Sequence, residues 1–389
     1  MFGAFLKLGV TSFGGPIAHL GYFRQAFVVR RRWIDEASYA DLVALCQFLP
    51  GPASSQVGFA LGLARGGPLG ALAAWTAFTL PSALLLFGFA YAAAAFAGPF
   101  GSAAIHGLKL VAVAIVAQAV WGMARTLTPD RPRAGIAMVA LFVVTLVGGG
   151  IGQVGAILIG AAGGLWLCRG GTPIVSGSLR FSVSRWLGVA SLVTFAAIFI
   201  GLPLLTAATG SQGLALFGSF YRSGALVFGG GHVVLPLLQA EVVTPGWTDN
   251  ATFLAGYGAA QAVPGPLFTF AAYLGAVVRP APHGAIGAAL ALVAIFLPGL
   301  LILIGALPFW DALRTRPAAQ AALRGVNAGV VGILAAALYT PVWTSAVLTA
   351  YDFAVAAGGF VLLTLWRMPP FLVVVVIVAL SVFPVFGSL

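Results

Sequence analysis

Residues 47–52 of the chain read QFLPGP and residues 261–266 read QAVPGP, so nearly the same string occurs twice inside strongly apolar runs. Proline lacks a backbone N–H and clashes with the carbonyl group one turn earlier, which prevents either run from forming an unbroken helix. The glycine between the prolines lets the chain turn where a side chain would obstruct it. The sequence therefore predicts a helix break at each copy.

Each break should also create a site for an anion. The second proline, Pro52 or Pro266, suits the first position of a new helix, whose leading N–H groups have no intrahelical acceptor. In lipid each such group would cost roughly several kcal/mol, so the breaks should be enclosed by protein or face a water-filled cavity. We therefore expect substrate contacts from both strings: Pro50, Gly51, Pro52, Pro264, Gly265 and Pro266.

The composition places the chain in a membrane. Of its 389 residues, 61% are hydrophobic and 7% are charged, and the mean hydropathy is +1.06. Long apolar runs recur from end to end, which predicts a polytopic helical membrane protein. Basic residues in short loops account for the net charge of +11, a pattern that favours topology determinants over nucleic-acid binding. No cleavable signal pattern follows Met1, and Cys46 and Cys168 are interpreted as packing residues.

The two strings belong to an internal repeat of a whole half-chain. Matching residues recur in the same order, with separations that drift only from 214 to 218 positions, as loop insertions would produce. The matched pairs are Phe13 and Phe228, Gly14 and Gly229, Gly15 and Gly230, Trp33 and Trp247, Gln47 and Gln261, Pro81 and Pro298, and Gly107 and Gly325.

Basic residues indicate the orientation of the segments. If every apolar segment crossed the membrane, the arginine-rich loops at residues 24–32 and 125–133 would lie on opposite sides, against the positive-inside bias. If the two segments of each broken unit are re-entrant, most arginines fall inside, and an additional segment at about 186–208 inverts the second half. The predicted fold class is an all-α polytopic membrane protein with two inverted-topology repeats and broken or re-entrant helices, an architecture common among secondary transporters.

This prediction divides the chain into three parts. The first transmembrane repeat spans residues 1–170, a connector plus an additional transmembrane helix spans 171–212, and the second transmembrane repeat spans 213–389.

The paired glycines of the two FGG strings allow a backbone to approach another backbone or a ligand closely. We expect the substrate to contact these strings, while tight helix packing is the alternative, since glycine is common where transmembrane helices touch. The residues concerned are Phe13, Gly14, Gly15, Phe228, Gly229 and Gly230.

Polar side chains beside the breaks are further candidates. Gln47 and Gln261 precede the first proline of each copy by three residues, where an amide can bind the substrate or satisfy the loose carbonyl groups of the broken helix. After the first break, Ser54, Ser55 and Gln56 offer donors in the new first turn, whereas the second copy has Thr269 between two phenylalanines. One half-site is therefore predicted to be polar and the other mostly apolar.

Three ionisable residues in apolar runs are candidates for gating or proton transfer. His19 and His232 follow the two FGG strings, although a neutral, hydrogen-bonded histidine is the commoner case. Lys109, with His106 one turn earlier, either acts in the membrane or snorkels to its interface. Trp33 and Trp247 are interpreted as interfacial anchors.

The order of FGGP, tryptophan and QFLPGP, repeated as FGGG, tryptophan and QAVPGP, resembles the chromate ion transporter (CHR) superfamily in its long, two-domain form. The resemblance covers essentially the entire chain. It implies a bacterial inner-membrane protein that exports chromate, coupled to the proton gradient, with sulfate as a second substrate of the same shape and charge. The second half departs from the first copy at Gly231, which stands where Pro16 would be.

Three other functions stay open at this stage. An anion channel could use the same site, and the donors do not exclude a carrier of another small solute. A membrane enzyme acting on lipids would need a paired acid and base in the core, and the eight acids fall mostly in predicted loops. The sequence has no GxxxxGK[ST] string, HExxH string or cysteine cluster, so no metal or cofactor is expected. The expected partners are an oxyanion and the lipid bilayer, and a homodimer is an open alternative.

Overall fold

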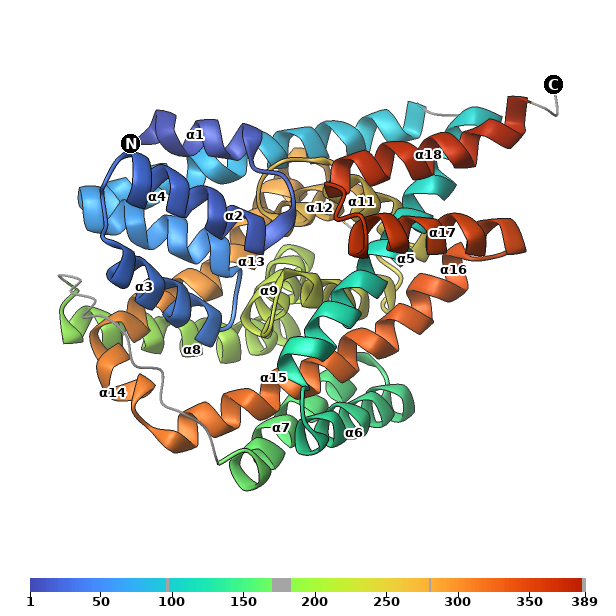
Figure 1. Cartoon of the computed structure of the whole chain (residues 1–389). Coiled ribbons are helices and arrows are strands. Elements are labelled where there is room, and N and C mark those ends of the chain that lie inside the picture. Colours follow the sequence, from blue (N-terminus) through green and yellow to red (C-terminus); the bar gives the residue numbers. More distant parts are fainter. Residues whose placement is uncertain (96–97, 170–182, 280, 387–389) are drawn as a thin grey trace.

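The computed structural model describes residues 1–95, 98–169, 183–279 and 281–386 (Figure 1). All regular elements in these ranges are helical, as the all-α class predicted. Six of the helices are long and apolar enough to cross a membrane. Most of the polar connector expected between the halves, residues 170–182, lies outside the described residues.

The first half is built from short broken helices followed by longer ones. Its elements, in chain order, are α1 (Phe2–Thr11), α2 (Gly15–Phe23), the π-helical turn η1 (Arg24–Arg30), α3 (Glu36–Phe48), α4 (Ala53–Ala95), α5 (Pro99–Leu127), α6 (Arg131–Val147) and α7 (Gly149–Leu167). The additional transmembrane helix predicted at about 186–208 is α8 (Arg185–Thr209).

The second half repeats this order. Its elements are α9 (Gln212–Ala225), η2 (Gly231–Val233), α10 (Val234–Leu238), the π-helical turn η3 (Gln239–Val243), α11 (Asn250–Ala262), η4 (Leu267–Thr269), α12 (Phe270–Val277), α13 (Gly284–Ala306), η5 (Leu307–Phe309), α14 (Trp310–Arg314), α15 (Pro317–Ala337), η6 (Leu338–Trp343), α16 (Thr344–Ala346), α17 (Ala350–Thr364) and α18 (Pro370–Phe386).

The long helix α4 is a helical hairpin. Gly66 and Gly67 leave helical geometry, with φ of −145° and +62°. A Cβ placed on Gly62 would lie 2.5 Å from the carbonyl oxygen of Gly70 and 2.7 Å from the Cβ of Ala74, residues that a straight helix would hold roughly 12 to 18 Å away. The chain therefore turns back after Arg65. Only its second arm is long enough to cross the roughly 30 Å hydrocarbon layer.

The second half contains the same hairpin as two separate helices, α12 and α13. Gly275 and Gly287 hold the two helices together, because a Cβ on either glycine would overlap the backbone of the other. Helix α12 has 8 residues and α11 has 13, so neither exceeds about 20 Å in length. The elements around the PGP strings are thus too short to span a bilayer singly.

The two halves exchange their last helices. Helices α6 and α7 of the first half pack on α15 of the second, and α17 and α18 of the second half pack on α5 of the first (Figure 1). The matched glycines support this exchange: Gly325 on α15 lies against Gly160 and Gly164 of α7, and Gly107 on α5 lies against Val378 of α18. Each half therefore completes its packing with helices of the other.

Corresponding aspartates begin α3 and α11. The Asp35 carboxylate accepts the backbone N–H of Ser38, and the Asp249 carboxylate accepts that of Thr252. Hydrogen bonding from Ser38 lowers the pKa of Asp35 below its usual value. These caps fix where the chain enters each helix that leads to a PGP string.

The inverted orientation of the halves is a prediction that labelling tests. With Cys46 and Cys168 replaced by alanine, single cysteines at the exposed positions Val29 and Thr244 should react with a membrane-impermeant maleimide from opposite faces. The reason is that the loop at 24–32 is predicted inside and the loop at 241–249 outside. Labelling after permeabilisation provides the control for reactivity. Reaction of both positions from one face would exclude the inversion.

Candidate functional site

The two FGG strings separate helices at corresponding places. Gly14 and Gly15 have φ of +99° and +76°, and Gly229 and Gly230 have φ of +73° and +146°. L residues with side chains rarely adopt these values, so the conformation explains why both strings carry paired glycines. A Cβ on Gly15 or Gly230 would meet nothing within 4 Å, whereas a Cβ on Gly14 would lie 3.1 Å from the Cβ of Ala18 and one on Gly229 would lie 3.2 Å from the Cε of Met123. In each string the first glycine is therefore closely packed and the second is not.

Both PGP strings interrupt helices, as predicted. The first lies between α3 and α4 and the second between α11 and η4, and their glycines have φ of +118° at Gly51 and +102° at Gly265. The prolines that follow stand one position earlier than expected, directly before the helix. The carbonyl oxygen of Pro52 accepts the Gln56 N–H, and that of Pro266 accepts the Thr269 N–H. Each proline therefore caps the helix that follows it.

Each PGP string bonds to the FGG region of the other half. The N–H of Gly51 donates to the carbonyl oxygen of Val227 at 2.8 Å, directly before Phe228. The N–H of Gly265 donates to the carbonyl oxygen of Ser12 at 2.9 Å, directly before Phe13. The breaks of the two halves are thus joined crosswise into one centre.

At this centre the mismatch between the FGGP and FGGG strings has a physical reason. Gly231 stands where Pro16 would be, and a Cβ on Gly231 would lie 3.2 Å from the Cγ atom of Pro16 and 3.9 Å from Leu267. The two equivalent positions therefore touch each other, and a second proline ring would have no room. The first residues of α2, η2 and η4 meet at this contact.

Around the first turn of α4, the side chains of Ser54, Ser55 and Gln56 are at most 2% exposed. The Gln56 amide donates to the carbonyl oxygens of Pro50 and Gly299, both at 2.9 Å, and so satisfies loose carbonyl groups at the break. The Ser55 hydroxyl and the Gln56 amide oxygen have no hydrogen-bond partner among the described residues. An unused buried donor thus lies in the first turn of a helix.

The second break is less polar, as the sequence predicted. The Thr269 hydroxyl is 1% exposed and donates to the carbonyl oxygen of Pro266 at 2.7 Å, so it is already occupied. Phe268, which matches Ser54, packs on Phe296 with ring centroids 5.7 Å apart.

The two glutamines before the breaks differ in their surroundings. Gln47 is exposed, and Gln56 carries out the carbonyl satisfaction that Gln47 was a candidate for. Gln261 is partly buried, and its amide nitrogen has no partner among the described residues. Of the pair, Gln261 alone presents an unused buried donor near the centre.

The candidate proton carriers lie in different places. The Nε2–H of His19, which is fully buried, donates to the Ser12 carbonyl oxygen at 3.1 Å, and its Nδ1 lies 3.4 Å from the Ser54 hydroxyl. Nδ1 of His232 lies 2.7 Å from the Tyr257 hydroxyl. His19 therefore touches both breaks of the first half, whereas His232 does not occupy the corresponding position.

Lys109 is partly buried on α5. Its counterpart Asn327 lies beside Gly229, where the amide oxygen would be 3.5 Å from an added Cβ. That oxygen has no partner among the described residues. The FGG string of the second half is thus flanked by an amide that the sequence did not single out.

Two of the eight acids are buried. Asp41 on α3 is fully buried and accepts the indole N–H of Trp310 at 3.0 Å. Asp352 is 6% exposed and lies 2.7 Å from Nε2 of His106 on α5. Their partners come from 246 to 269 positions away in the chain, a distance that no local pattern reveals.

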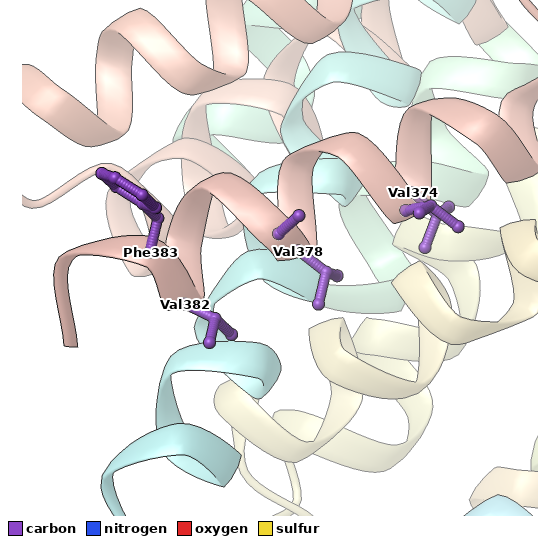
Figure 2. A pocket seen from close by; sticks show the side chains of 6 residues that line it. Val374, Val378, Val382 and Phe383 are labelled. Atoms are coloured by element: carbon purple, nitrogen blue, oxygen red, sulfur yellow. The ribbon is translucent and has the colours of Figure 1, made fainter. Parts of the chain in front are cut away.

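An open groove along α18 does not suit an anion. Its volume is about 650 Å³, and its lining consists of Val374, Val375, Val378, Ala379, Val382 and Phe383. Figure 2 shows that the labelled side chains contain only carbon atoms and all belong to α18. Such a surface suits lipid chains and offers no donor to an oxyanion.

Comparison with known proteins gives a consistent picture. Residues 1–166 and 214–383 match the family described as "Chromate transporter". The chain is 31% identical to the "Chromate transport protein" of Pseudomonas aeruginosa, over 86% of this chain and 79% of that protein. It is 30% identical to the "Probable chromate transport protein" of Synechococcus elongatus, over 86% and 82% of the two chains. An uncharacterized transporter of Methanocaldococcus jannaschii is 27% identical over 86% and 82%. No solved structure matches.

Methyl groups on the PGP glycines should destabilise the centre. In Gly265→Ala the new Cβ would lie 2.6 Å from the Ser82 hydroxyl oxygen, and in Gly51→Ala 3.0 Å from the Gly299 Cα. Left-handed strain adds ~1–2 kcal/mol in each variant, so the melting temperature of the purified protein should fall in both. Gly88→Ala is the matched control, since nothing lies within 4 Å of its Cβ and alanine favours helix. Equal melting temperatures for all three variants would contradict the crossed arrangement.

Proposed function

This chain belongs to the chromate transporter family, a family of membrane transporters, and on that basis we propose that it carries chromate across the membrane as a secondary transporter. It is a multi-pass membrane protein. Membership in a transporter family sets aside the lipid enzyme that the sequence left open.

We propose that chromate binds where the four breaks meet. The observation that carries this proposal is the crosswise pairing of Gly51 with Val227 and of Gly265 with Ser12. This pairing brings together the N-terminal ends of α2, α4, η2 and η4. The first residues of α2, η2 and η4 meet at the contact between Pro16 and Gly231. The first N–H groups of a helix lack intrahelical acceptors and carry partial positive charge, which suits an anion.

The chemistry of the centre fits a doubly charged tetrahedral oxyanion. Ser55 adds an unused hydroxyl at the start of α4, and Gln261 adds an unused amide. The four strings themselves contain no charged residue. Neutral donors hold an anion more weakly than a paired cation would, so that release is not prevented. Sulfate shares the shape and charge of chromate and is the second substrate that we propose.

We further propose that the two halves are inverted repeats with re-entrant helices, bounded at residues 1–170, 171–212 and 213–389. Two features support this proposal. First, the last two helices of each half pack on a helix of the other half: α6 and α7 on α15, and α17 and α18 on α5. Second, the helices beside each PGP string are too short to span the bilayer singly. In such an architecture the substrate binds between repeats, and rocking of one against the other opens each side in turn.

Export from the cytoplasm of a bacterium, driven by the proton gradient, completes the proposal. His19 is the proton acceptor that the geometry favours over His232 and Lys109. Its partner, the Ser12 carbonyl oxygen, also accepts the Gly265 N–H. A change of charge on His19 would therefore act directly on a hydrogen bond that joins the two halves.

Replacing one unused hydroxyl tests the site. Ser55→Ala should weaken chromate binding roughly ten- to a hundredfold, because a donor to a charged group contributes about 1.5–3 kcal/mol. Its melting temperature should stay unchanged or rise, since the hydroxyl has no partner among the described residues. Direct binding of chromate to purified protein, together with thermal unfolding, provides both measurements.

The contrasting variant is Thr269→Ala, whose hydroxyl is bonded within its own helix. It should lower the melting temperature but change chromate affinity less than Ser55→Ala does. If both variants leave affinity unchanged, the anion does not bind at the breaks.

A further inference from the structure

A second polar pocket lies away from the breaks, beside the additional helix α8. Its volume is about 550 Å³. It is formed by the last turns of α8, by one face of α9, by η3 and by the segment that follows η3. The lining residues are Pro203, Thr206, Ala207, Ala215, Ser219, Arg222, Ala240, Glu241, Thr244, Pro245 and Trp247.

A forked ion pair occupies the wall of this pocket. Arg222 donates from Nε to Oε1 of Glu241 at 3.0 Å and from Nη2 to Oε2 at 2.6 Å. Nη2 also donates to the Ser219 hydroxyl at 3.2 Å. The side chains of Arg222 and Glu241 are 31% and 21% exposed, so both remain accessible from the pocket. The Glu241 carboxylate thus accepts hydrogen bonds from the two parallel N–H groups with which a guanidinium can also bind a planar or tetrahedral oxyanion.

The first half shows that the fold does not require this acid. Arg222 matches Lys7 at the 215-position separation of the FGG strings, so both halves carry a cation at this place. The position that matches Glu241 is Ala26, or Phe27 at the separation of 214, yet the first half still forms the π-helical turn η1 there. Lys7 forms no ion pair with an acidic group among the described residues.

The position of the pair connects it to the centre. Arg222 lies in the last turn of α9, five residues before Val227, whose carbonyl oxygen accepts the Gly51 N–H. Glu241 lies in a π-helical turn, a distortion often found at functional sites. A change at the pair would therefore reach both helices that flank the FGG break of the second half.

We propose that this pocket is an accessory binding site for a divalent oxyanion, in which the entering anion replaces Glu241 on the fork of Arg222. Thr206, Ser219 and Thr244 also line the pocket, and their hydroxyl groups would be the donors to the other oxygens of the anion. Glu241 then acts as an internal competitor that closes the fork when no anion is present. The proposal takes its class of ligand from the proposed function, but it concerns separate residues.

Sulfate binding to the purified full-length chain, followed by isothermal titration calorimetry, tests this exchange. Glu241→Gln removes the competing charge while keeping side-chain length, so the Kd for sulfate at the pocket should fall about tenfold. Adding Arg222→Gln or Arg222→Lys should abolish this gain, since neither side chain offers the two parallel donors. Arg279→Gln is the matched control, because it removes the cation of an exposed pair, 3.9 Å from Asp249 and outside the pocket, and should leave sulfate binding unchanged.

The same titration separates this pocket from the centre. In Ser55→Ala, sulfate binding at the pocket should persist and should be lost when Arg222→Gln is added. If Glu241→Gln lowers the melting temperature without changing the Kd, the pair is only a clamp between α9 and η3, and the accessory site is wrong. If Ser55→Ala removes all sulfate binding and the pocket variants change nothing, the accessory site is wrong while the proposed function stands. An equal gain in Glu241→Gln with and without Arg222→Gln would also overturn it.

Discussion

Two backbone hydrogen bonds join the two halves of this protein where their helices are broken, and the arrangement of the other helices depends on them. A helix that stops inside a membrane leaves N–H and carbonyl groups without partners, at a cost of roughly several kcal/mol each in lipid. Here the N–H of Gly51 finds Val227 and that of Gly265 finds Ser12, so each half satisfies the break of the other. The packing of α6 and α7 on α15, and of α17 and α18 on α5, joins the same two halves a second time.

The same crossing explains why the repeat is imperfect. Equivalent residues of the two halves meet at the centre, and at such a meeting point both halves cannot carry the same bulky residue. Here one half has the proline ring of Pro16, and the other has Gly231, which carries no side chain and leaves room for that ring. The residues that follow the two PGP strings differ as well. Ser54 and Ser55 in the first half correspond to Phe268 and Thr269 in the second, and the Thr269 hydroxyl is already bonded. An anion bound at the proposed site would therefore have one polar side and one apolar side.

Local chemistry made the breaks predictable from the sequence. Proline and glycine act on the backbone of their own segment, so QFLPGP, QAVPGP and the paired glycines fix where helices stop, whatever surrounds them. The same reasoning could not choose partners across the chain. It selected Gln47, yet Gln56 bonds to Gly299, 243 positions away, and it did not pair Asp352 with His106. The turn at Gly66 and Gly67 follows from local sequence as well, because the first broken unit was predicted to end at about residue 63 and the next apolar segment to begin at about 68.

The distribution of charge separates two tasks that a single strong site could not perform together. A guanidinium fork attracts a dianion from some distance and holds it firmly, which serves capture but slows release. Neutral N–H and hydroxyl donors bind only at contact and hold less firmly, which serves passage. In this chain the fork of Arg222 lies in a pocket at the end of α8 and is already occupied by Glu241, while the strings at the centre carry no charge. Because a dianion would first have to displace the Glu241 carboxylate from Arg222, its affinity for the guanidinium would stay moderate. In the proposed arrangement, capture in the pocket and passage through the centre would use donors of different strength, joined by the short stretch of chain between Arg222 and Val227.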